Sequence, residues 1–390
     1  MSERRQVQLA DLGVIYDGPH ATPARVNAGP YFLNIASLQS GRLDLTASDH
    51  VSREDFKKWT RRVTPQPFDL LFSYETRLGE AALMPPGVEA CLGRRMALLR
   101  PDRAVVHPRF LLYLFLGPEF QRLIDKHTIH GATVNRIGLS TMGAWPVTLP
   151  TMSSQESIAG VLGALDDKIA ANRLLVETSE ALAVAQAARF EPTVPLGEIA
   201  FHHKRMLAPG AMVDDRVAHY SLPAFDEMHA PEVVTPSKIK SGKFEVAGPS
   251  VLVSKLNPRF PRIWDLPGVR PMRALASTEF LVLESRYSSS TVLWAVLAQP
   301  AFSASLESQV AGTSGSHQRV RPVDLLATEV IDPRAMGDRT MAAITALGQS
   351  IALCRAESLK VVELRDTLLP ELMSGRLRVK DAEKVVEEVV

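Results

Sequence analysis

The clearest pattern along the chain is an alternation of three- and four-residue steps between apolar positions, and it occurs twice. In the middle of the sequence the pattern is carried by Ile158, Leu162, Leu165, Ile169, Val176 and Ala183, with Asn172 and Ser179 at the remaining steps. Near the C-terminus it is carried by Ile344, Leu347, Ile351, Cys354, Ser358, Val361 and Leu368. This heptad spacing predicts two long helices, each with one apolar stripe.

Helix signals predict where the first of these helices begins and ends. Ser153 and Glu156 are spaced as a capping box, and Pro192 and Pro195 end the pattern. The helix is therefore expected over about 153–190, roughly 55 Å at the helical rise per residue.

The same signals are present around the second helix. The sequence Asp332-Pro333 is a plausible start, and Pro370 and Gly375 are a plausible finish.

The chain also aligns with itself at a shift of about 182 residues, which places "ALDDKI" (164–169) on "ALGQSI" (346–351). The segments before the helices align in the same order: 68–79 with 249–260, 90–102 with 273–285, 107–124 with 289–306, and 130–137 with 311–320. The sequence therefore predicts one duplication of a mixed α/β globule followed by a long helix, and no short-period solenoid.

Two helices with apolar stripes bury them best against each other. We therefore predict an α+β protein with two mixed α/β domains, an antiparallel coiled coil and a pseudo-two-fold internal repeat. Asn172 could fix the register of the coiled coil, or its side chain could face solvent. The expected domains are 1–150, a central helix 151–191, 192–335, a C-terminal helix 336–375 and a tail 376–390.

Composition gives an ordinary globular protein, with 46% hydrophobic and 22% charged residues. The longest apolar runs, 110–116 and 292–298, are too short to span a bilayer, and the N-terminus shows no signal peptide. Cys91 and Cys354 are the two cysteines, and they lie far apart. This usage favours a reducing cytoplasm without a disulfide scaffold or a membrane partner.

The net charge of +1 does not by itself indicate nucleic-acid binding. The charge is uneven, because the tail 380–390 is acidic while several segments are basic: 53–62, 93–103, 201–206, 238–243 and 257–262. Scattered solvated charge explains each segment about as well as a binding surface does.

Motifs for catalysis are missing from the sequence. It has no GxGxxG, Walker, HExxH or GxSxG motif, and the pair 202–203 ("HH") lacks a third metal ligand at helical spacing. The segment "LNPRF" (256–260) is close to the (D/N/S)PP(Y/F) loop of amino-methyltransferases, with Arg259 at the second proline. No glycine-rich cofactor loop accompanies it, so we expect no catalytic residue, metal or cofactor. Asp166, Asp167 and Glu177 are interpreted as structural.

Several segments together resemble the specificity (S) subunit of type I restriction-modification systems. They are "TLPTMSSQESIAGVLGALDDKIAANRLLVETSEALA" (148–183) and "LRDTLLPELMSGRLRV" (364–379), with "VQLADLGVIYDGPHATP" (7–23) and "GPYFLNIASLQSGRLDL" (29–45) similar to the family's start. The resemblance covers nearly the whole chain. The second copy departs from it, with "LGQSIALC" in place of "LDDKIAAN".

The resemblance implies a non-catalytic subunit. Each globule would be a target recognition domain that reads one half of a split, asymmetric sequence in double-stranded DNA. The helices would space the half-sites and dock two modification subunits, which bind S-adenosylmethionine and methylate adenine. Restriction subunits would add a translocase and a nuclease. Two alternatives stay open: a self-contained DNA adenine methyltransferase, and a coiled-coil adaptor without DNA affinity.

Polar loop stretches at matching positions of the two copies are the candidates for reading bases, since arginine favours guanine, and asparagine or glutamine favours adenine. In the first copy they are Ser73, Tyr74, Thr76, Arg77, Thr133, Asn135 and Arg136, and in the second Lys255, Asn257, Arg259, Ser316, His317, Gln318 and Arg319. Candidate phosphate contacts are Lys57, Lys58, Arg61, Arg62, Lys204 and Arg205. An exposed residue without a DNA contact is the competing interpretation of each. Trp59 and Trp264 are expected in the core.

Overall fold

The structure is a computed structural model that describes residues 4–20, 22–131, 133–191, 193–212, 214–268, 272–309 and 318–388. The chain divides into two compact units. Unit 1 is Met1–Lys168 with Lys360–Val390, and unit 2 is Ile169–Leu359. The division passes through both long helices, so each unit contains a part of each helix. The domain borders expected from the sequence stay predictions.

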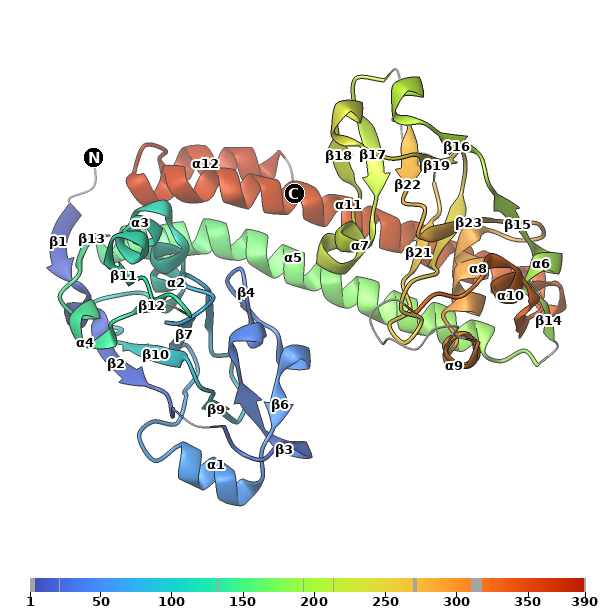
Figure 1. Cartoon of the computed structure of the whole chain (residues 1–390). Helices are drawn as coiled ribbons and strands as arrows, with labels where there is room; N and C mark the ends of the chain where they lie inside the picture. The colour runs from blue at the N-terminus through green and yellow to red at the C-terminus, as the bar shows by residue number, and fades with distance from the viewer. Residues whose placement is uncertain are drawn as a thin grey trace. The chain divides into compact units, whose positions relative to one another are not determined.

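Unit 1 is built around a four-stranded antiparallel sheet in the order β2-β10-β7-β8, of which β2, β10 and β7 are labelled in Figure 1. Its strands are β2 (Gly13–Asp17), β7 (Leu70–Ser73), β8 (Ala81–Leu83) and β10 (Met96–Pro101). A second sheet, β6-β3-β9, contains a parallel pair formed by β3 (Val26–Leu33) and β9 (Ala90–Leu92), with β6 (Asp49–His50) antiparallel to β3.

Two consecutive helices of unit 1, α2 and α3, begin with a proline at the first turn, where a missing N–H does no harm. Nearly all of α2 is buried, as its apolar sequence requires. The helices are α1 (Arg53–Trp59), α2 (Pro108–Leu116), α3 (Pro118–His127) and α4 (Leu139–Met142). The remaining strands are β1 (Arg4–Gln8), β4 (Leu38–Gln39), β5 (Arg42–Leu43), β11 (Thr128–Ile129), β12 (Arg136–Ile137) and β13 (Pro146–Pro150).

Unit 2 repeats this plan. Its antiparallel sheet has the order β15-β23-β20-β21, and its second sheet, β16-β19-β22-β17-β18, again contains a parallel pair, β17 with β22. The equivalent strands are β15 (Ala200–His203), β20 (Ser250–Ser254), β21 (Ile263–Leu266), β23 (Phe280–Ser285), β17 (Val217–Tyr220) and β22 (Ala274–Ala276). The matching strand orders confirm the predicted duplication.

The other elements of unit 2 complete the repeat, since α8 and α9 follow β23 as α2 and α3 follow β10. Its helices are α6 (Leu196–Ile199), α7 (Leu222–Met228), α8 (Ser290–Leu297), α9 (Pro300–Ser308) and α10 (Pro322–Ala327). Its remaining strands are β14 (Thr193–Pro195), β16 (Met206–Leu207), β18 (Glu232–Val234), β19 (Lys243–Val246) and β24 (Glu329–Ile331).

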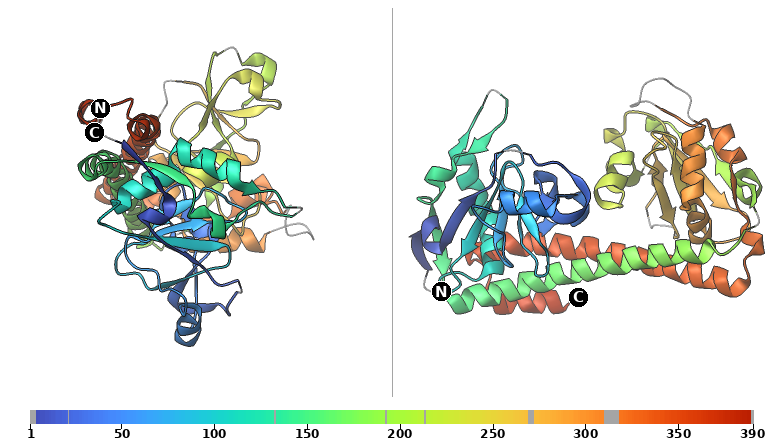
Figure 2. Two further views of the ribbon diagram at one scale, coloured as in Figure 1. Left: turned by 90° about the vertical axis from the view of Figure 1, so that its left-hand side faces the viewer. Right: turned by 90° about the horizontal axis from the view of Figure 1, so that it is seen from below.

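The two predicted long helices are α5 (Met152–Ala187) and α11 (Asp338–Ser374), and a short helix α12 (Val379–Glu387) follows. Within each unit α5 lies beside α11 (Figures 1 and 2). The apolar stripes face this contact: Leu162 and Ile158 are buried in unit 1, and Ile344 and Ile351 in unit 2. The predicted packing of the two helices is confirmed.

Several predicted helix ends were wrong. At the start of α5 the backbone N–H of Ser154 donates to the hydroxyl of Thr151, two residues before the expected cap at Ser153. The helix ends at Ala187, three residues before the predicted end near 190.

At the second helix, Asp332 caps a short 3₁₀ turn, Pro333–Ala335, and α11 begins only at Asp338. Pro370 lies inside α11 and does not end it. The predicted finish at Gly375 is confirmed, because α11 ends at Ser374 and Gly375 adopts a φ of 74°.

Polar side chains fix the helix contact in both units. In unit 1, Asp166 accepts hydrogen bonds from the hydroxyl of Tyr113 on α2, at 2.6 Å, and from Arg365 on α11, at 3.0 Å. In unit 2, Asn172 is 5% exposed and donates to Glu357 at 2.8 Å. The open question about Asn172 is thereby decided, because its amide is buried in the helix contact.

Among the described residues, no helix combines the length and the apolar character that crossing a membrane requires.

Candidate nucleic-acid interface

The predicted base-reading stretches of unit 1 lie against each other. The backbone N–H of Thr76 donates to the carbonyl of Asn135 at 3.1 Å, and the N–H of Ile137 donates to the carbonyl of Tyr74 at 2.8 Å. Residues 74–76 and 135–137 therefore form a short antiparallel contact, which we call the loop crossing of unit 1. It joins the end of β7 to β12.

The corresponding stretches of unit 2 form the same contact. The N–H of Asn257 donates to the carbonyl of Gln318 at 2.9 Å, and the N–H of Val320 donates to the carbonyl of Lys255 at 3.0 Å. Residues 255–257 and 318–320 are the loop crossing of unit 2. The sequence alignment had paired these stretches, and the backbone hydrogen bonds show that they are structurally equivalent.

Two further details repeat in both crossings. The hydroxyl of Ser73 donates to the carbonyl of Glu75 at 2.8 Å, and the hydroxyl of Ser254 donates to the carbonyl of Leu256 at 3.1 Å. Thr76 and Asn257 both adopt a positive φ, 69° and 50°. Positive φ is uncommon outside glycine, so its recurrence at the equivalent position indicates that the crossing requires this backbone bend.

The side chains of the unit 1 crossing fall into two groups. Thr76, Thr133, Asn135 and Arg136 are exposed. Ser73 and Tyr74 are buried, and burial together with the nearby Asp17 carboxylate raises the pKa of Tyr74.

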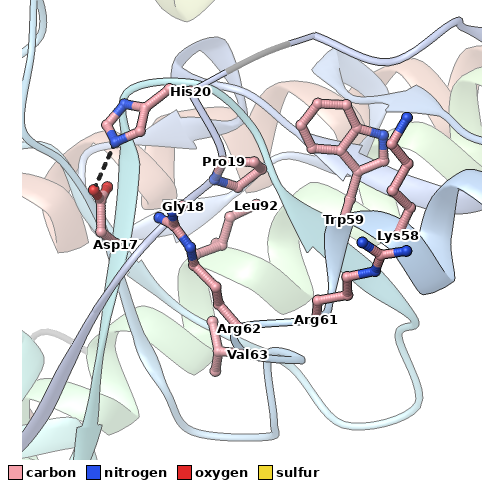
Figure 3. Close-up of a pocket in the computed structure, with 10 residues that line it drawn as sticks. All are labelled: Asp17, Gly18, Pro19, His20, Lys58, Trp59, Arg61, Arg62, Val63 and Leu92. Carbon is pink, nitrogen blue, oxygen red and sulfur yellow. Dashed lines mark ion pairs between the residues drawn. The ribbon is translucent and has the colours of Figure 1, made fainter.

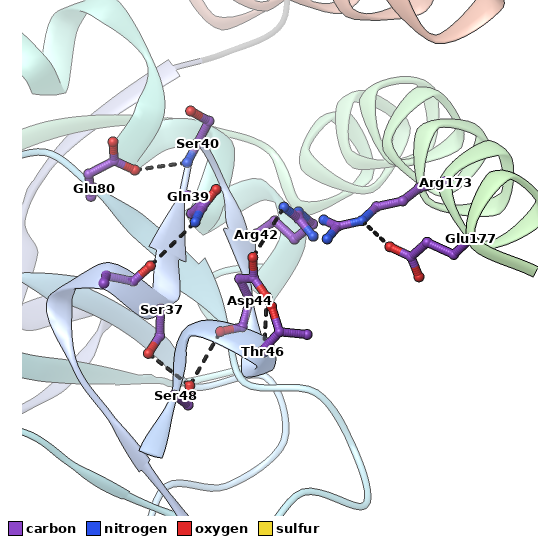
Figure 4. A network of polar contacts seen from close by, with 11 residues as sticks. Ser37, Gln39, Ser40, Arg42, Asp44, Thr46, Ser48, Glu80, Arg173 and Glu177 are labelled. Carbon is purple, nitrogen blue, oxygen red and sulfur yellow. Dashed lines mark hydrogen bonds and ion pairs between the residues drawn. The ribbon is translucent and has the colours of Figure 1, made fainter. Parts of the chain in front are cut away.

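Arg77 is engaged inside unit 1. Its guanidinium donates to the carbonyl of Ile35 at 3.0 Å and to Glu80 at 3.1 Å. Glu80 also accepts the backbone N–H of Ser40 at 2.8 Å, which is drawn in Figure 4. Arg77 and Glu80 thereby attach the hairpin β4–β5 to the loop that follows the crossing.

The hairpin itself is held by short polar contacts. Its turn residues Ser40 and Gly41 have φ values of 48° and 92°. Beyond β5, Asp44 accepts the N–H of Thr46 at 3.0 Å, and the hydroxyls of Ser37 and Ser48 are 2.8 Å apart (Figure 4). The segment "NIASLQSGRLDL" is therefore a folded support beside the crossing.

In unit 2, Arg259 and Arg319 are exposed, while Lys255, Asn257 and Gln318 are half-buried. Glu279 holds Arg319 through two hydrogen bonds of 3.0 and 3.1 Å, and this pairing lowers the pKa of Glu279. The remaining predicted readers, Ser316 and His317, lie outside the described residues.

An ion pair accompanies each crossing, with the charges exchanged. The backbone carbonyl of Arg95 accepts a hydrogen bond from the N–H of Tyr74, and the Arg95 side chain pairs with Glu75 at 3.0 Å. Glu279 offers the equivalent carbonyl to Lys255 and pairs with Arg319. The sequence analysis missed Arg95, Glu75 and Glu279. The basic segment 93–103 was a signal for Arg95, whereas nothing local marked the two glutamates.

The predicted phosphate contacts are exposed in both units. Lys58, Arg61 and Arg62 line a pocket of about 440 Å³ with Trp59 (Figure 3). Lys57 is exposed on the same helix, α1, and is not part of the pocket lining. In unit 2, Lys204 is exposed and Arg205 pairs with Glu245 at 3.0 Å.

The structure gives His202 and His203, the "HH" pair of the sequence, contacts other than metal ligation. His203 forms an ion pair with Glu284, and burial lowers the pKa of His202. Within the described ranges, no group of three or more histidine, cysteine or acidic side chains is placed to hold a metal ion.

The fold and the crossings define a class of protein in which one α/β unit with a polar loop crossing is duplicated and each copy is joined to a long helix. Among solved structures, the type I restriction-modification S subunit from M. genitalium has this fold. It aligns over 95% of this chain and 96% of its own, with a TM-score of 0.55 and 15% identity. The HsdS subunit from Thermoanaerobacter tengcongensis aligns over 96% and 97% at 16% identity, and its TM-score of 0.35 is too low to add to the argument.

Sequence comparison leads to the same kind of protein. A protein from Methanocaldococcus jannaschii, named as the MjaX type I restriction enzyme specificity subunit, is 27% identical over 168 residues. The match covers 40% of this chain and 38% of the relative, so the chain spans well under half of that protein's length. No protein-family model matches the chain. The resemblance to specificity subunits is confirmed, in sequence over part of the chain and in fold over nearly all of it.

Proposed function

We propose that this chain is the non-catalytic, sequence-specific DNA-binding subunit of a type I restriction-modification complex. Each unit would read one half of a bipartite, asymmetric target in double-stranded DNA. The observation that carries the proposal is the loop crossing, which occurs once in each unit with the same hydrogen bonds and different side chains. A repeated backbone with varied side chains is what two readers of different half-sites require.

The exposed side chains at the crossings are the best candidates for contacting bases. In unit 1 these are Thr76, Thr133, Asn135 and Arg136, and in unit 2 Arg259 and Arg319, with Lys255, Asn257 and Gln318 beside them. Ser73, Tyr74 and Arg77 would instead hold the crossing in place, because their polar groups are buried or used internally.

We assign two roles to the long helices. As a spacer, the 36 residues of α5 extend over about 54 Å, which suits half-sites one to two turns of DNA apart. As a docking surface, they expose large apolar side chains, including Leu174 on α5 and Leu353 on α11, 65% and 72% exposed. Exposed leucines of this kind favour contact with partner proteins, here two methyltransferase subunits, with restriction and translocase subunits joining the complex.

In this proposal, methylation and cleavage are performed by the partner subunits. The protein would act in the cytoplasm, where its DNA lies and where the buried free thiols of Cys91 and Cys354 stay reduced.

A domain exchange tests the proposal. Residues 1–150 are replaced by the corresponding segment of a related subunit, the protein is expressed with its methyltransferase partner, and genomic methylation is sequenced. We expect one half of the methylated motif to change and the other half to be retained. Exchanging 192–335 is the matched control and should change the other half. An unchanged motif in both exchanges would favour the coiled-coil adaptor.

The methyltransferase alternative depends on the segment 256–260. The structure gives its bend an independent reason, because Asn257 occupies the position of Thr76 in the unit 1 crossing. Incubating the purified chain alone with labelled S-adenosylmethionine and DNA decides the matter. We expect no methyl incorporation, and incorporation would overturn the proposal.

The spacer role has its own test. Inserting seven residues into both helices adds about 10 Å. We expect either a longer gap between the half-sites in the methylated motif or loss of recognition. A motif with an unchanged gap would show that the helices do not set it.

A further inference from the structure

The pocket beside α1 brings together three cations that have no ion pair. Several arginines elsewhere in the described part of unit 1 are paired with carboxylates: Arg25 with Asp49, Arg53 with Glu89, Arg77 with Glu80, Arg95 with Glu75, Arg100 with Asp69 and Arg109 with Asp167. Lys58, Arg61 and Arg62 have no ion pair or hydrogen bond within the described residues, although all three line one pocket. Three neighbouring unpaired cations repel one another and favour an anion between them.

The ring of Trp59 forms one wall of the pocket and packs against the core cluster of Phe32, Val51 and Cys91. Its indole N–H is shielded from solvent. Figure 3 shows Trp59 on the wall of the pocket with Lys58 and Arg61 next to it.

One carboxylate lines the pocket, that of Asp17. Its oxygen lies 2.9 Å from the imidazole of His20, as Figure 3 shows. Asp17 also lies close enough to Tyr74 to raise the pKa of its hydroxyl, after the larger effect of burial. Because Tyr74 is part of the loop crossing, the pocket and the crossing are neighbours in the same unit.

A simpler explanation covers part of the cluster. Lys57 and Lys58 lie in the last turn of α1, where cations stabilise the negative end of a helix dipole. This explanation does not extend to Arg61 and Arg62, which follow the helix.

We propose that this pocket is a phosphate-binding site, in which Arg61, Arg62 and Lys58 supply charge and the ring of Trp59 forms a wall. The phosphate would come from the DNA backbone of the half-site that unit 1 reads. In that respect the inference rests on the proposed function, and it adds a fixed anchoring point next to the base-reading crossing. Such an anchor sets the register of the crossing on the duplex.

The main test uses the complete complex with its methyltransferase subunits and its own target DNA. Arg61→Gln/Arg62→Gln is compared with Arg122→Gln/Lys126→Gln, which removes two exposed cations of α3 outside the pocket. We expect the pocket variant to bind about tenfold more weakly and to reduce the salt slope of binding by one to two, on the order of one per lost phosphate contact. The α3 variant should change affinity less than about twofold. Equal effects of the two changes would contradict a defined site.

A second measurement locates the phosphate. Single methylphosphonate linkages, which are uncharged, are placed at each position of the unit 1 half-site. We expect the uncharged linkage at one position to weaken DNA binding by the wild-type complex. The same linkage should not weaken binding further in the Arg61→Gln/Arg62→Gln variant. A scan in which no position couples to these arginines would overturn the DNA backbone as the source.

A third measurement separates this inference from the proposed function. Inorganic phosphate is titrated into the free chain, and tryptophan fluorescence is compared between the wild type and Trp59→Phe. Binding that requires Arg61 and Arg62, with no coupling in the DNA scan, would support the site with free phosphate as its ligand. If neither phosphate nor DNA depends on the two arginines, the site is rejected, even where the complex still recognises its target.

Discussion

Unit 1 and unit 2 have the same strand order and the same loop crossing, yet they use different side chains at equivalent positions. The pairing of β7 with β8 and of β20 with β21 makes Leu83 the equivalent of Asp265. Likewise, the shift of 182 residues places Gly348 of α11 at the position of Asp166 of α5. The comparison teaches that the backbone plan survives while the interactions that hold it are replaced.

The helix contacts show this replacement best. In unit 1, Asp166 and Asp167 join α5 to α2 through Tyr113 and Arg109. In unit 2 the same kind of contact, between α11 and α8, is a close approach, because a Cβ added at Gly348 would lie 1.9 Å from the hydroxyl oxygen of Thr291. The two aspartates of the "LDDK" motif in the first copy therefore hold α5 on α2 by polar contacts. In the second copy, close packing of α8 on α11 takes the place of these contacts.

The basic segments beside the second sheet also differ. In unit 1, α1 follows β6 and leads to the pocket with three unpaired cations. In unit 2, two of the three lysines in the segment after β18 are used internally: Lys240 donates to the carbonyl of Ser237 at 3.0 Å and Lys243 to the hydroxyl of Ser241 at 2.7 Å, while Lys238 is exposed. Burial lowers the pKa of Lys243. We therefore assign the phosphate site to unit 1.

The largest expected effect comes from filling the close approach in unit 2. Gly348→Ala should lower the free energy of unfolding by about 3 kcal/mol, because Thr291 is fully buried and cannot move away. Gly160→Ala, on the other long helix, is the control, since nothing lies within 4 Å of the added Cβ. Denaturant unfolding measures both, and equal stabilities of the two variants would contradict the close packing of α8 on α11.

The next largest effect concerns the polar contacts that Asp166 and Asp167 of α5 make in unit 1. Asp166→Ala should cost about 2 kcal/mol of unfolding free energy, because it leaves the buried hydroxyl of Tyr113 without its acceptor and removes one of the two partners of Arg365. Asp167→Ala breaks an exposed pair with Arg109 and should cost less than about 1 kcal/mol. Similar losses for the two variants would show that Asp166 is not the residue that matters.

The crossings can be compared through their arginines. Arg319 is held by Glu279, whereas the exposed Arg136 has no ion pair or hydrogen bond from its side chain within the described chain. Arg319→Gln should weaken target binding about tenfold and relax one position of the unit 2 half-site, and Arg136→Gln should do the same in the other half-site. Binding selection from randomised half-sites reads out both. Relaxation in the wrong half would refute the assignment of units to half-sites.

The smallest effect is a pH dependence of stability in unit 2. Burial raises the pKa of Asp265 to about 6 from its ordinary value of 3.8, so its contribution to stability is complete below about 4 and is lost as pH rises through 6. Burial, with a smaller effect from Arg355, lowers the pKa of His229 from 6.5 to about 4, so its contribution is present above 6.5 and is lost as pH falls through 4. The two trends oppose each other between pH 4 and 6 and largely cancel.

Single substitutions separate the two trends. In Asp265→Asn only the His229 trend remains, so the free energy of unfolding should increase with pH between 4 and 6. In His229→Gln only the Asp265 trend remains, so the free energy of unfolding should decrease over the same range. Thermal or denaturant unfolding at half-unit intervals of pH measures the slopes. Slopes of the same sign in the two variants would contradict the assigned burial of one of these groups.

The sequence by itself determined the architecture of this protein. Heptad spacing predicted α5 and α11, since a stripe such as Leu162 and Leu165 can be buried only against a partner. Self-alignment predicted the duplication, because order along the chain is preserved even where single residues have diverged. The polar loop stretches of the candidate site were also found in this way, since they occupy matching positions in the two copies.

The tertiary structure decided what local pattern cannot encode. Pro370 ends a helix by local rules, but it lies within α11, whose helix continues to Ser374. Arg95, Glu75 and Glu279 belong to the crossings through partners that are distant in sequence or carry no motif. The division of the predicted readers into exposed and internally used side chains, and the unpaired cations around Trp59, depend on which chain segments meet. The reason is physical: the burial and pairing of a charge are properties of its surroundings in space, which spacing along the chain does not specify.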